Sequence, residues 1–276
     1  MKVAVVAICY NAYSDTIKFL NSIHSASEKV NDLDLEVIVC DNSTNGTGLE
    51  ELSSEILNYG YRYIKLDNVG YFPAFFKGFK ALNDSDQIDW DFVIVSNVDL
   101  LIDGDFFVNL NNCEFSRDVG VVAPSIISKQ TNEDINPKIF KRPKRNKLLM
   151  LYFGFQRLWF YKFYVWLSIN RAKRRGKKQT RGEAYPSGTV MYAAHGSLMI
   201  FTSSYLEKGA SLDYPRFLFG EEVFVAEEAR LKKLLTVYSP ELKVYDNEHG
   251  STSKEAEKFI SLEHVKSYDQ LLRKYF

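Results

Sequence analysis

The chain has 276 residues, of which 46% are hydrophobic, so it can bury a sizeable core as one large or two modest domains. Its net charge is zero, and its three cysteines (Cys9, Cys40 and Cys113) are too widely spaced to support a disulfide framework or a zinc site. Met1 leads directly into an apolar strand without a signal-peptide pattern, which together with reduced cysteines predicts a cytoplasmic protein.

The first 125 residues alternate between strand and helix patterns. Short apolar runs predict buried strands, and apolar residues at helical spacing predict the helices between them. This alternation favours a three-layer α/β fold with a mostly parallel sheet. In chain order, the expected elements are a strand over Val3–Ile8, a helix over Ser14–Ser25, a strand over Leu35–Cys40, a helix over Leu49–Asn58, a strand over Tyr61–Leu66, a helix over Phe75–Leu82, and strands over Phe92–Val95 and Val119–Ala123.

After Pro186 the pattern changes to short strands and loops. The expected elements there are strands over Val190–Tyr192, Ser197–Phe201, Thr236–Tyr238 and Lys243–Tyr245, an acidic helix that opens at Phe217–Phe224 and continues through Ala226–Leu235, and a last helix from about Lys254 to Tyr275. We expect a single catalytic domain over 1–276. Its parts would be a nucleotide-binding half (1–125), a basic aromatic insertion (138–181), an acceptor and catalytic half (186–253) and a C-terminal helix (254–276).

Carboxylates follow two of the expected strands. Asp99 comes shortly after the run Phe92–Val95, and Asp41 comes directly after Leu35–Cys40. Neighbouring parallel strands would bring both to one sheet edge, where open α/β sheets bind their ligands. Mg²⁺ and Mn²⁺ are typically bound by one or two carboxylates plus substrate phosphates, so Asp99 is a candidate metal ligand. The alternative is an Asp that only caps the turn after its strand.

Tyr10 and Asn11 follow the first strand, at the same expected edge. Neither a GxGxxG motif nor a GxxxxGK[ST] motif occurs in the chain, which argues against a dinucleotide oxidoreductase and a P-loop enzyme. A tyrosine at this edge could stack on a nucleobase while Asp41 accepts a hydrogen bond from the base. As isolated residues, Tyr10 and Asn11 are more often packing and turn residues.

Glu221 and Glu222 stand where the acidic helix is expected to begin. The helix dipole favours Glu in a first turn, which explains them structurally, whereas a functional reading makes them a general base near a hydroxyl acceptor. His249 lies in a glycine-containing loop and is a candidate second metal ligand, better suited to Mn²⁺ than to Mg²⁺. His24 and His264 lie in helical stretches and are expected to have no catalytic role.

Six short motifs stand in order along the chain: Ile8–Asn11, Val39–Ser43, Asp67–Tyr71, Ser96–Asp99, Gly220–Val223 and His249–Ser251. In this order they resemble family 2 glycosyltransferases, in particular the rhamnosyltransferase-like members of bacterial surface polysaccharide assembly, such as O-antigen synthesis. The resemblance covers nearly the whole chain except Lys138–Arg181. It implies a GT-A fold of the nucleotide-diphospho-sugar transferase type.

The resemblance also implies a role for each matching residue. Asp99 and His249 would hold a Mg²⁺ or Mn²⁺ ion on the diphosphate, and Glu222 would be the catalytic base with Glu221 beside it. His195 and Gly196 would lie in the acceptor region. The residues that would bind the nucleotide are Tyr10, Asn11, Asp41, Asn68, Gly70 and Asn97. The chain departs from the family pattern where Asn97 replaces a carboxylate, where Glu222 replaces a frequent Asp, and where Phe76 replaces a frequent Asn.

The activity that the resemblance implies is an inverting transfer of a sugar from a nucleoside diphosphate to a saccharide or lipid-linked saccharide, with dTDP-rhamnose as the first donor to consider. Two alternatives stay open. One is a catalytically inactive membrane-surface module that keeps the glycosyltransferase fold. The other is a sugar nucleotidyltransferase, although the glycine-rich basic loop of such enzymes is absent after the first strand.

The segment from Lys138 to Arg181 contains fifteen Lys and Arg residues and no Asp or Glu. Within it, Leu148–Ile169 is rich in aromatic residues and long enough to span a bilayer. Arg157 and Lys162 lie near its middle, however, and each would cost about 2.5–3.5 kcal/mol there. The pattern therefore favours a helix in the headgroup layer, with Lys141–Arg145 and Arg171–Lys178 on anionic lipid.

This interpretation places the protein peripherally on the inner face of the plasma membrane. The alternative is an insertion that packs on the catalytic domain or on a partner subunit. Nucleic acid is not an expected partner, because no RNA-binding motif accompanies the basic aromatic segment.

Overall fold

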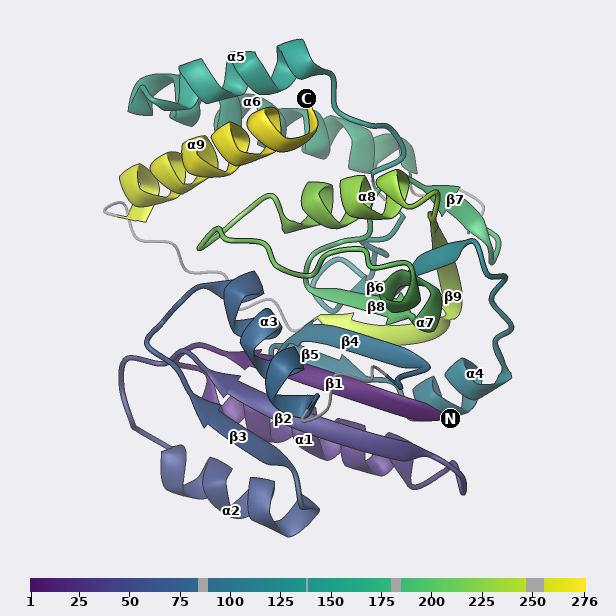
Figure 1. The fold of residues 1–276 in the computed structure, drawn as a ribbon. Helices are drawn as coiled ribbons and strands as arrows, with labels where there is room; N and C mark the ends of the chain where they lie inside the picture. The colour runs from purple at the N-terminus through teal and green to yellow at the C-terminus, as the bar shows by residue number, and fades with distance from the viewer. Residues whose placement is uncertain (84–88, 138, 180–184, 247–255) are drawn as a thin grey trace.

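The computed structural model describes residues 1–83, 89–137, 139–179, 185–246 and 256–276, with side chains described outside 172–179 and 256 (Figure 1). Its centre is one nine-stranded sheet in the order β3-β2-β1-β4-β8-β6-β9-β5, with β7 paired to β9. The strands are β1 (Lys2–Cys9), β2 (Asp34–Asp41), β3 (Arg62–Lys65), β4 (Phe92–Asn97), β5 (Leu100–Ile102), β6 (Val119–Ser128), β7 (Thr189–Met191), β8 (Leu198–Thr202) and β9 (Leu235–Asp246).

Helices cover both faces of this sheet. One face carries α1 (Tyr13–Ser27), α2 (Leu49–Tyr59) and α4 (Phe106–Asn112), and the other carries α3 (Tyr71–Leu82), α7 (Ser203–Glu207) and α8 (Glu221–Leu231). A further layer of α5 (Arg145–Phe155), α6 (Leu158–Gln179) and α9 (Ala256–Tyr275) lies outside α8, at the top of Figure 1. The predicted three-layer α/β architecture is confirmed, and this extra helical layer is added to it.

The sheet is mostly parallel, as predicted. β1, β2, β3, β4, β6 and β9 share one direction, whereas β5, β7 and β8 run against it. β1 lies between β2 and β4. After β1 the chain adds β2 and β3 on one side of it and then crosses back to add β4 on the other side. The carboxyl ends of β1 and β4 therefore border the crevice in which open α/β sheets bind ligands.

The alternation of side chains along β1 explains why this strand is apolar on both faces. Ala4, Val6 and Ile8 join the core under α3 and α8, while the intervening valines and alanine join the core over α1 and α2. A strand covered by helices on both sides leaves no position for a polar residue, which is why its sequence is a continuous apolar run.

Two parts of the fold differ from the pattern expected after residue 98. β5, α4 and α7 were not expected, because three-residue strands and helices of five to seven residues give weak periodic signals. The two short strands expected over 236–245 form one strand, β9. In the pairing of β9 with β6, Ser239 lies opposite Pro124, and Lys243 lies opposite the next residue, Ser125. Residues 240–242 of β9 therefore form a bulge, and the pairing continues beyond Pro240.

The aromatic insertion forms two helices, whereas a single helix was expected. α5 ends at Phe155 and α6 begins at Leu158. Gly154 allows the two helices to pack closely where the chain folds back, because a Cβ there would lie 2.3 Å from the ring of Phe160. Within the described part of the chain, no helix is long and apolar enough to cross a membrane.

Candidate active site

A cavity of about 730 Å³ opens at the carboxyl edge of the parallel strands. It is lined by residues at the ends of β1 and β4, by the first turn of α8 and by α9. The size lies within the range of small-molecule sites. Of the predicted site residues, the cavity wall includes Tyr10, Asn68, Gly70, Asn97, His195, Gly196, Glu221 and Glu222.

Strand register brings the sheet-side residues together. Ile8 pairs with Asn97 of β4, and Cys9 pairs with Asp41 of β2, so Asn97 and Asp41 flank the end of β1. Tyr10 follows immediately, is 53% exposed and lines the cavity. An exposed ring at this edge provides a flat apolar face onto which a nucleobase can stack.

Asp41 is buried, with 0% of its surface exposed, and is not part of the cavity wall. Its Oδ2 accepts hydrogen bonds from the hydroxyls of Tyr13 (3.0 Å) and Tyr63 (2.7 Å) and from Lys65 Nζ (3.1 Å). Its Oδ1 accepts the backbone N–H of Ser43 at 2.8 Å. In this arrangement Asp41 holds the loop after β2 in place, and the predicted contact with a base stays a prediction.

The pKa of Asp41 reflects these contacts. Burial alone would raise the pKa, but the hydrogen bonds from Ser43, Tyr63 and Lys65 outweigh it and hold the pKa below its usual value. The next residue, Asn42, faces the cavity instead and binds the following segment, donating to Gly70 O at 3.0 Å and accepting the N–H of Val69.

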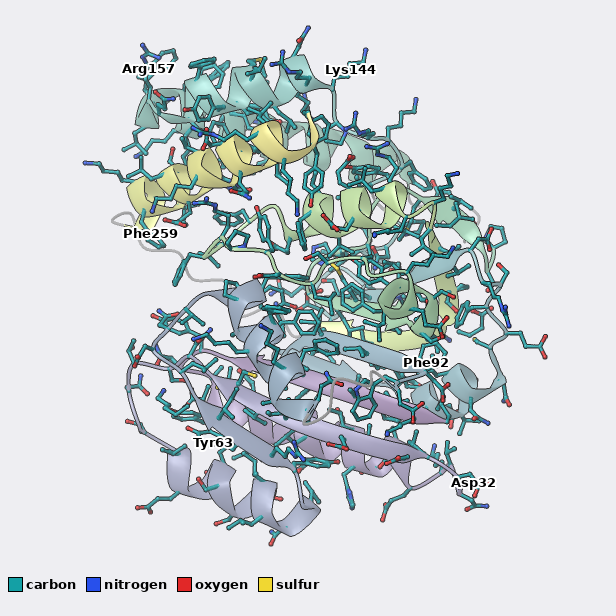
Figure 2. All side chains as sticks on the ribbon, viewed as in Figure 1. Asp32, Tyr63, Phe92, Lys144, Arg157 and Phe259 are labelled. Carbon is teal, nitrogen blue, oxygen red and sulfur yellow. The ribbon has the colours of Figure 1, made fainter. Side chains whose placement is uncertain are left out.

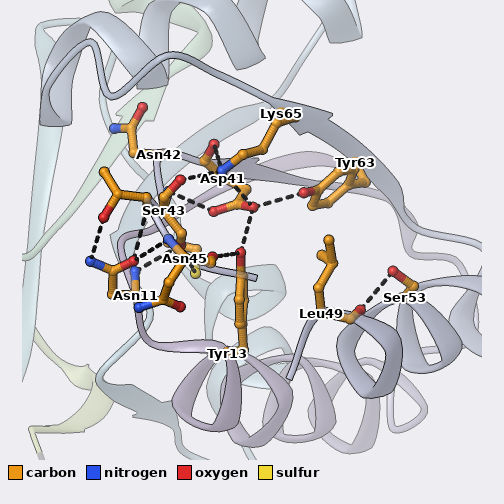
Figure 3. Close-up of polar contacts among 12 residues, drawn as sticks. Asn11, Tyr13, Asp41, Asn42, Ser43, Asn45, Leu49, Ser53, Tyr63 and Lys65 are labelled. Atoms are coloured by element: carbon orange, nitrogen blue, oxygen red, sulfur yellow. Dashed lines mark hydrogen bonds and ion pairs between the residues drawn. The ribbon is translucent and has the colours of Figure 1, made fainter. Parts of the chain in front are cut away.

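Asn11 also acts on the loop after β2. Its backbone has a φ of 51°, a left-handed conformation that Asn tolerates better than most residues. Its N–H donates to Ser43 Oγ at 2.7 Å, and its side-chain oxygen accepts the backbone N–H of Thr44 at 3.0 Å (Figure 3). Asn11 is exposed and is not in the cavity wall, and its predicted role in nucleotide binding stays a prediction.

Gly70 is required where the loop from β3 meets the segment before α8. Its φ is +96°, and a Cβ would lie 2.2 Å from the backbone oxygen of Phe217. The same oxygen accepts the N–H of Tyr71 at 3.1 Å. This close approach brings the segment after β3 against the segment before α8, and both segments line the cavity. Asn68, two residues before Gly70, also lines it.

The two glutamates are positioned by a left-handed turn. Phe219 has φ 65° and Gly220 has φ 89°, and Gly220 is the N-cap of α8. The turn is held by Tyr214, whose hydroxyl donates to Phe219 O at 2.9 Å. A Cβ on Gly220 would lie 2.1 Å from Ser267 Oγ, so only glycine fits. Glu221 and Glu222 therefore enter the cavity at the positive end of the helix.

Around these glutamates, backbone and hydroxyl groups from two other segments converge. Oε1 of Glu222 accepts the N–H of Gly196 at 2.9 Å, and the carbonyl of Gly196 accepts the hydroxyl of Tyr71 at 2.8 Å. Burial and then the charge of Glu222 raise the pKa of Glu221 to about 7. One carboxyl of the pair thus exchanges its proton near neutral pH, a property typical of functional sites.

His195 lies in the cavity wall beside Gly196. Its backbone N–H donates to Asn136 Oδ1 at 3.1 Å, and its ring Nδ1 lies 2.9 Å from Ser197 Oγ. These contacts fix the loop between β7 and β8 against the insertion side of the molecule. The prediction that this loop borders the acceptor stays a prediction.

α9 contributes a wall that we did not expect from the sequence. His264, Ser267, Tyr268 and Leu271 all line the cavity, and Leu148 of α5 joins them. The ring of His264 stacks on Phe219 with centroids 3.8 Å apart, and burial lowers the pKa of His264 to about 4. The spacing of 264, 267, 268 and 271 along one helix face was the available signal, since it combines polar and aromatic residues in one stripe.

Asp99 lies half-buried just beyond β4, although the cavity wall includes Asn97 and not Asp99. Burial, followed by the charges of Glu221, Asp99 and Glu222, raises the pKa of the Tyr71 hydroxyl well above its usual value, so these carboxylates surround one region. Among the described residues, no group of three or more His, Cys, Asp or Glu side chains could hold a metal. His249 lies outside the described residues.

Asp99 fits a metal ion that would be coordinated partly by the protein and partly by a bound substrate. Mg²⁺ is commonly held by one or two carboxylates while substrate phosphates and water complete its coordination. A single carboxylate beside the cavity meets that requirement, whereas a cage made by protein side chains alone is not present in the described part of the chain.

No protein-family model and no curated protein matches this sequence. Solved structures do match it. S. aureus TarS 1-349 in complex with UDP-GlcNAc aligns over 97% of this chain and 66% of that chain, at 12% identity and a TM-score of 0.55. The mannosyltransferase PcManGT from Pyrobaculum calidifontis, in complex with GDP-Man and Mn²⁺, aligns over 99% and 65%, at 15% identity and a TM-score of 0.55.

The chain has a GT-A glycosyltransferase fold. GalNAc-T7 with UDP, GalNAc and Mn²⁺ shares it as well, over 95% of this chain and 48% of that one, at 13% identity and a TM-score of 0.55. This chain spans only 39% of the longer TarS chain. At these identities the GT-A comparison establishes the fold, and the fold expected from the sequence motifs is confirmed.

Proposed function

We propose that this GT-A chain is a metal-dependent, inverting glycosyltransferase that uses a nucleoside diphosphate sugar as donor. The observation that carries the proposal is the cavity, whose wall combines Tyr10 and Asn97 at the sheet edge with Glu221 and Glu222 at the start of α8. A platform for a base and a pair of carboxylates in one cavity suit a donor nucleotide and a hydroxyl acceptor. Neighbours with the same fold were solved with UDP-GlcNAc and with GDP-Man.

In this proposal the nucleotide lies along the sheet edge. The base stacks on Tyr10, and the ribose and diphosphate extend past Asn68 and Gly70 toward Asn97. The absence of a glycine-rich phosphate loop fits this arrangement, since side chains and a cation would hold the phosphates. Asp99, with His249 as its companion, would bind the Mg²⁺ or Mn²⁺, which supplies charge neutralisation at the diphosphate when bound.

Glu222 is the proposed general base. It would take the proton of the acceptor hydroxyl as the hydroxyl oxygen attacks the anomeric carbon, while the bond from that carbon to the diphosphate oxygen breaks on the opposite face. Attack from the face opposite the leaving group inverts the anomeric centre. The hydrogen bond from Gly196 to Oε1 keeps the Glu222 carboxylate in one orientation for this transfer. Glu221 stands beside it as a second proton acceptor, and a pKa of about 7 suits that task.

The acceptor would enter from the side of His195, Gly196 and α9. We propose a saccharide or lipid-linked saccharide in surface polysaccharide synthesis, with rhamnose from dTDP-rhamnose as the first donor to test. A lipid-linked acceptor would place the protein peripherally on the inner face of the plasma membrane.

The proposal is tested by calorimetric titration of UDP, dTDP and GDP with and without Mn²⁺. We expect one diphosphate to bind in a Mn²⁺-dependent way, and Asp99→Ala to abolish that dependence. Tyr10→Ala should weaken binding by about 1–3 kcal/mol, whereas Tyr10→Phe keeps the ring and should not. Asp32→Ala, at an exposed carboxylate just before β2 and so at the other end of the strand from the cavity edge, is the matched control.

Binding of no diphosphate under either condition would contradict the proposal and favour a module that keeps the fold without the chemistry. Release of pyrophosphate from a nucleoside triphosphate and a sugar phosphate would instead identify a nucleotidyltransferase.

A further inference from the structure

The outer face of α5 and α6 carries large apolar side chains that the fold does not bury. Trp159 is 66% exposed and Trp166 is 60% exposed. We define the outer face by its exposed members: Met150, Phe153, Trp159, Phe163, Trp166 and Ile169. Four of them, at positions 159, 163, 166 and 169, follow the spacing of one stripe along α6.

The inner faces of the same two helices explain the rest of their apolar residues. On α5, Leu148, Leu151 and Phe155 are buried, and Phe155 packs edge-on against His264 and Tyr268 of α9. Gly154 receives the ring of Phe160 from α6. The insertion therefore packs on the catalytic domain through its inner faces, which is one of the two arrangements expected from the sequence. This packing does not explain why large apolar side chains are exposed on the outer face.

Positive charge surrounds the outer face. Lys144, Arg145, Lys147, Arg157 and Arg171 are exposed, and none of them has an ion pair among the residues that the structure describes. Figure 2 shows Lys144 and Arg157 at opposite ends of α5, on the outer edge of the molecule. Arg142 and Lys162 pair with Glu227 and Glu257, so they are part of the fold. The segment from 138 to 181 contains no carboxylate to offset these charges.

We propose that the outer face docks on an anionic lipid bilayer. Tryptophan and phenylalanine at exposed positions suit the boundary between headgroups and acyl chains, and a rim of Lys and Arg suits anionic headgroups. The charges of the insertion argue for lipid over a second copy of this chain, because two such faces brought together would repel. α5 and α6 lie in the interface plane and do not cross it.

This docking surface adjoins the proposed active site. Leu148 of α5 lines the cavity on its inner side, and Phe155 contacts the two α9 residues, His264 and Tyr268, that also line it. A bilayer on the outer face is thus separated from the α9 wall of the cavity by one layer of helices. The inference rests on the proposed function only in this point: an acceptor anchored in that bilayer would reach Glu222 from the α9 side.

The test is sedimentation of the full chain with phosphatidylcholine vesicles, with and without an added anionic phospholipid. We expect binding to the anionic vesicles only, reduced at least tenfold in Trp159→Ser/Trp166→Ser and in Arg157→Gln/Arg171→Gln. Leu57→Ser removes an 80% exposed leucine on α2 and is the matched control, with binding unchanged. Thermal unfolding of each variant confirms that it is folded.

Tryptophan fluorescence gives a second readout on the wild-type chain. The protein has three tryptophans, of which Trp90 is buried while Trp159 and Trp166 are exposed. Anionic vesicles should shift the emission to shorter wavelength, and lipid-borne quenchers should reduce it. Equal binding to neutral and anionic vesicles, binding lost equally in Leu57→Ser, or concentration-dependent self-association without vesicle binding would each overturn the proposal. None of these readouts depends on nucleotide binding or turnover, so either proposal can fail without the other.

Discussion

Gly196 and Glu222 are joined by a hydrogen bond of 2.9 Å, from the backbone N–H of the glycine to Oε1 of the glutamate. The same glycine accepts the hydroxyl of Tyr71 through its carbonyl. A Cβ at Gly196 would lie 3.0 Å from Oε1 of Glu221, so the absence of a side chain lets both glutamates approach this backbone. The backbone of one residue thereby connects α3, the loop before β8 and the start of α8.

Replacing Glu222 by Gln should nearly silence sugar transfer while leaving diphosphate binding intact. The amide keeps an oxygen for the Gly196 N–H but cannot accept a proton, and general-base help is typically worth about 10²–10⁴-fold. The measurement is steady-state transfer alongside calorimetric binding of the diphosphate. Glu51→Gln, on the exposed side of α2, is the control. Full turnover in Glu222→Gln would show that another group, with Glu221 the first to examine, is the base.

Glu221 should make the protein less stable as pH rises. Burial and the neighbouring Glu222 raise its pKa from 4.5 to about 7, so between these values the folded state holds more protons than the unfolded chain. The free energy of unfolding therefore falls as pH rises through this window. In Glu221→Gln, the loss of stability between about pH 5 and about pH 8 should shrink by about 1–3 kcal/mol, as measured by urea denaturation. An unchanged pH profile would contradict the raised pKa.

Titration of His264 should make the protein less stable as pH falls, which is the opposite pH dependence from that of Glu221. Burial lowers the pKa of His264 from 6.5 to about 4, so between these values the unfolded chain binds more protons and stability falls as the solution becomes more acidic. His264→Phe keeps a ring to stack on Phe219 without the titration. Its stability should depend less on pH between about 4 and about 6.5, and a wild-type profile in this variant would refute the assignment.

Gly220→Ala should destabilise the fold more than a left-handed backbone alone explains. Gly60 has φ 68°, and a Cβ added there would have no other atom within 4 Å, so Gly60→Ala should cost only the conformational term of about 1–2 kcal/mol. At Gly220, with φ 89°, the new Cβ also meets Ser267 Oγ and Tyr214 Oη, which should add about 1–3 kcal/mol. Chemical denaturation compares the two variants. Equal losses of unfolding free energy in the two variants would mean that α9 shifts to accommodate the new methyl group without a further cost.

Asp41→Asn should loosen the loop after β2. The amide cannot accept all of the hydrogen bonds from Tyr13, Tyr63 and Lys65, which should cost about 1–3 kcal/mol of unfolding free energy. Because the pKa of Asp41 is lowered in the fold, its stabilisation is present above its unfolded pKa and is lost as pH falls.

The control is Asp105→Asn, which breaks an exposed pair with Lys29 and should cost less than about 1 kcal/mol. If Asp41→Asn leaves stability unchanged but weakens diphosphate binding, then Asp41 contacts the nucleotide, as the sequence motifs suggested.

Local sequence determined the strands and the edge at which they end. Val3–Ile8 and Phe92–Val95 are buried by helices on both faces, so each had to be a continuous apolar run that stops where the polar edge begins. That reasoning placed Tyr10, Asn11, Asp41 and Asp99 at one edge of the sheet. The cavity wall includes Tyr10 but not the other three. The pair Glu221–Glu222 was located by another local signal, because the helix dipole favours acidic residues in a first turn.

Tertiary structure alone decided which edge residues face the cavity and what stands opposite them. Asp41 and Asn42 are adjacent, and only the packing of Tyr13, Tyr63 and Lys65 around one of them buries it and leaves the other at the cavity. The wall made by α9 is also a long-range result. His264 meets Phe219 from a separate helix, and no pattern within either segment specifies that contact, because periodicity reports which side of a helix is buried but not against which partner.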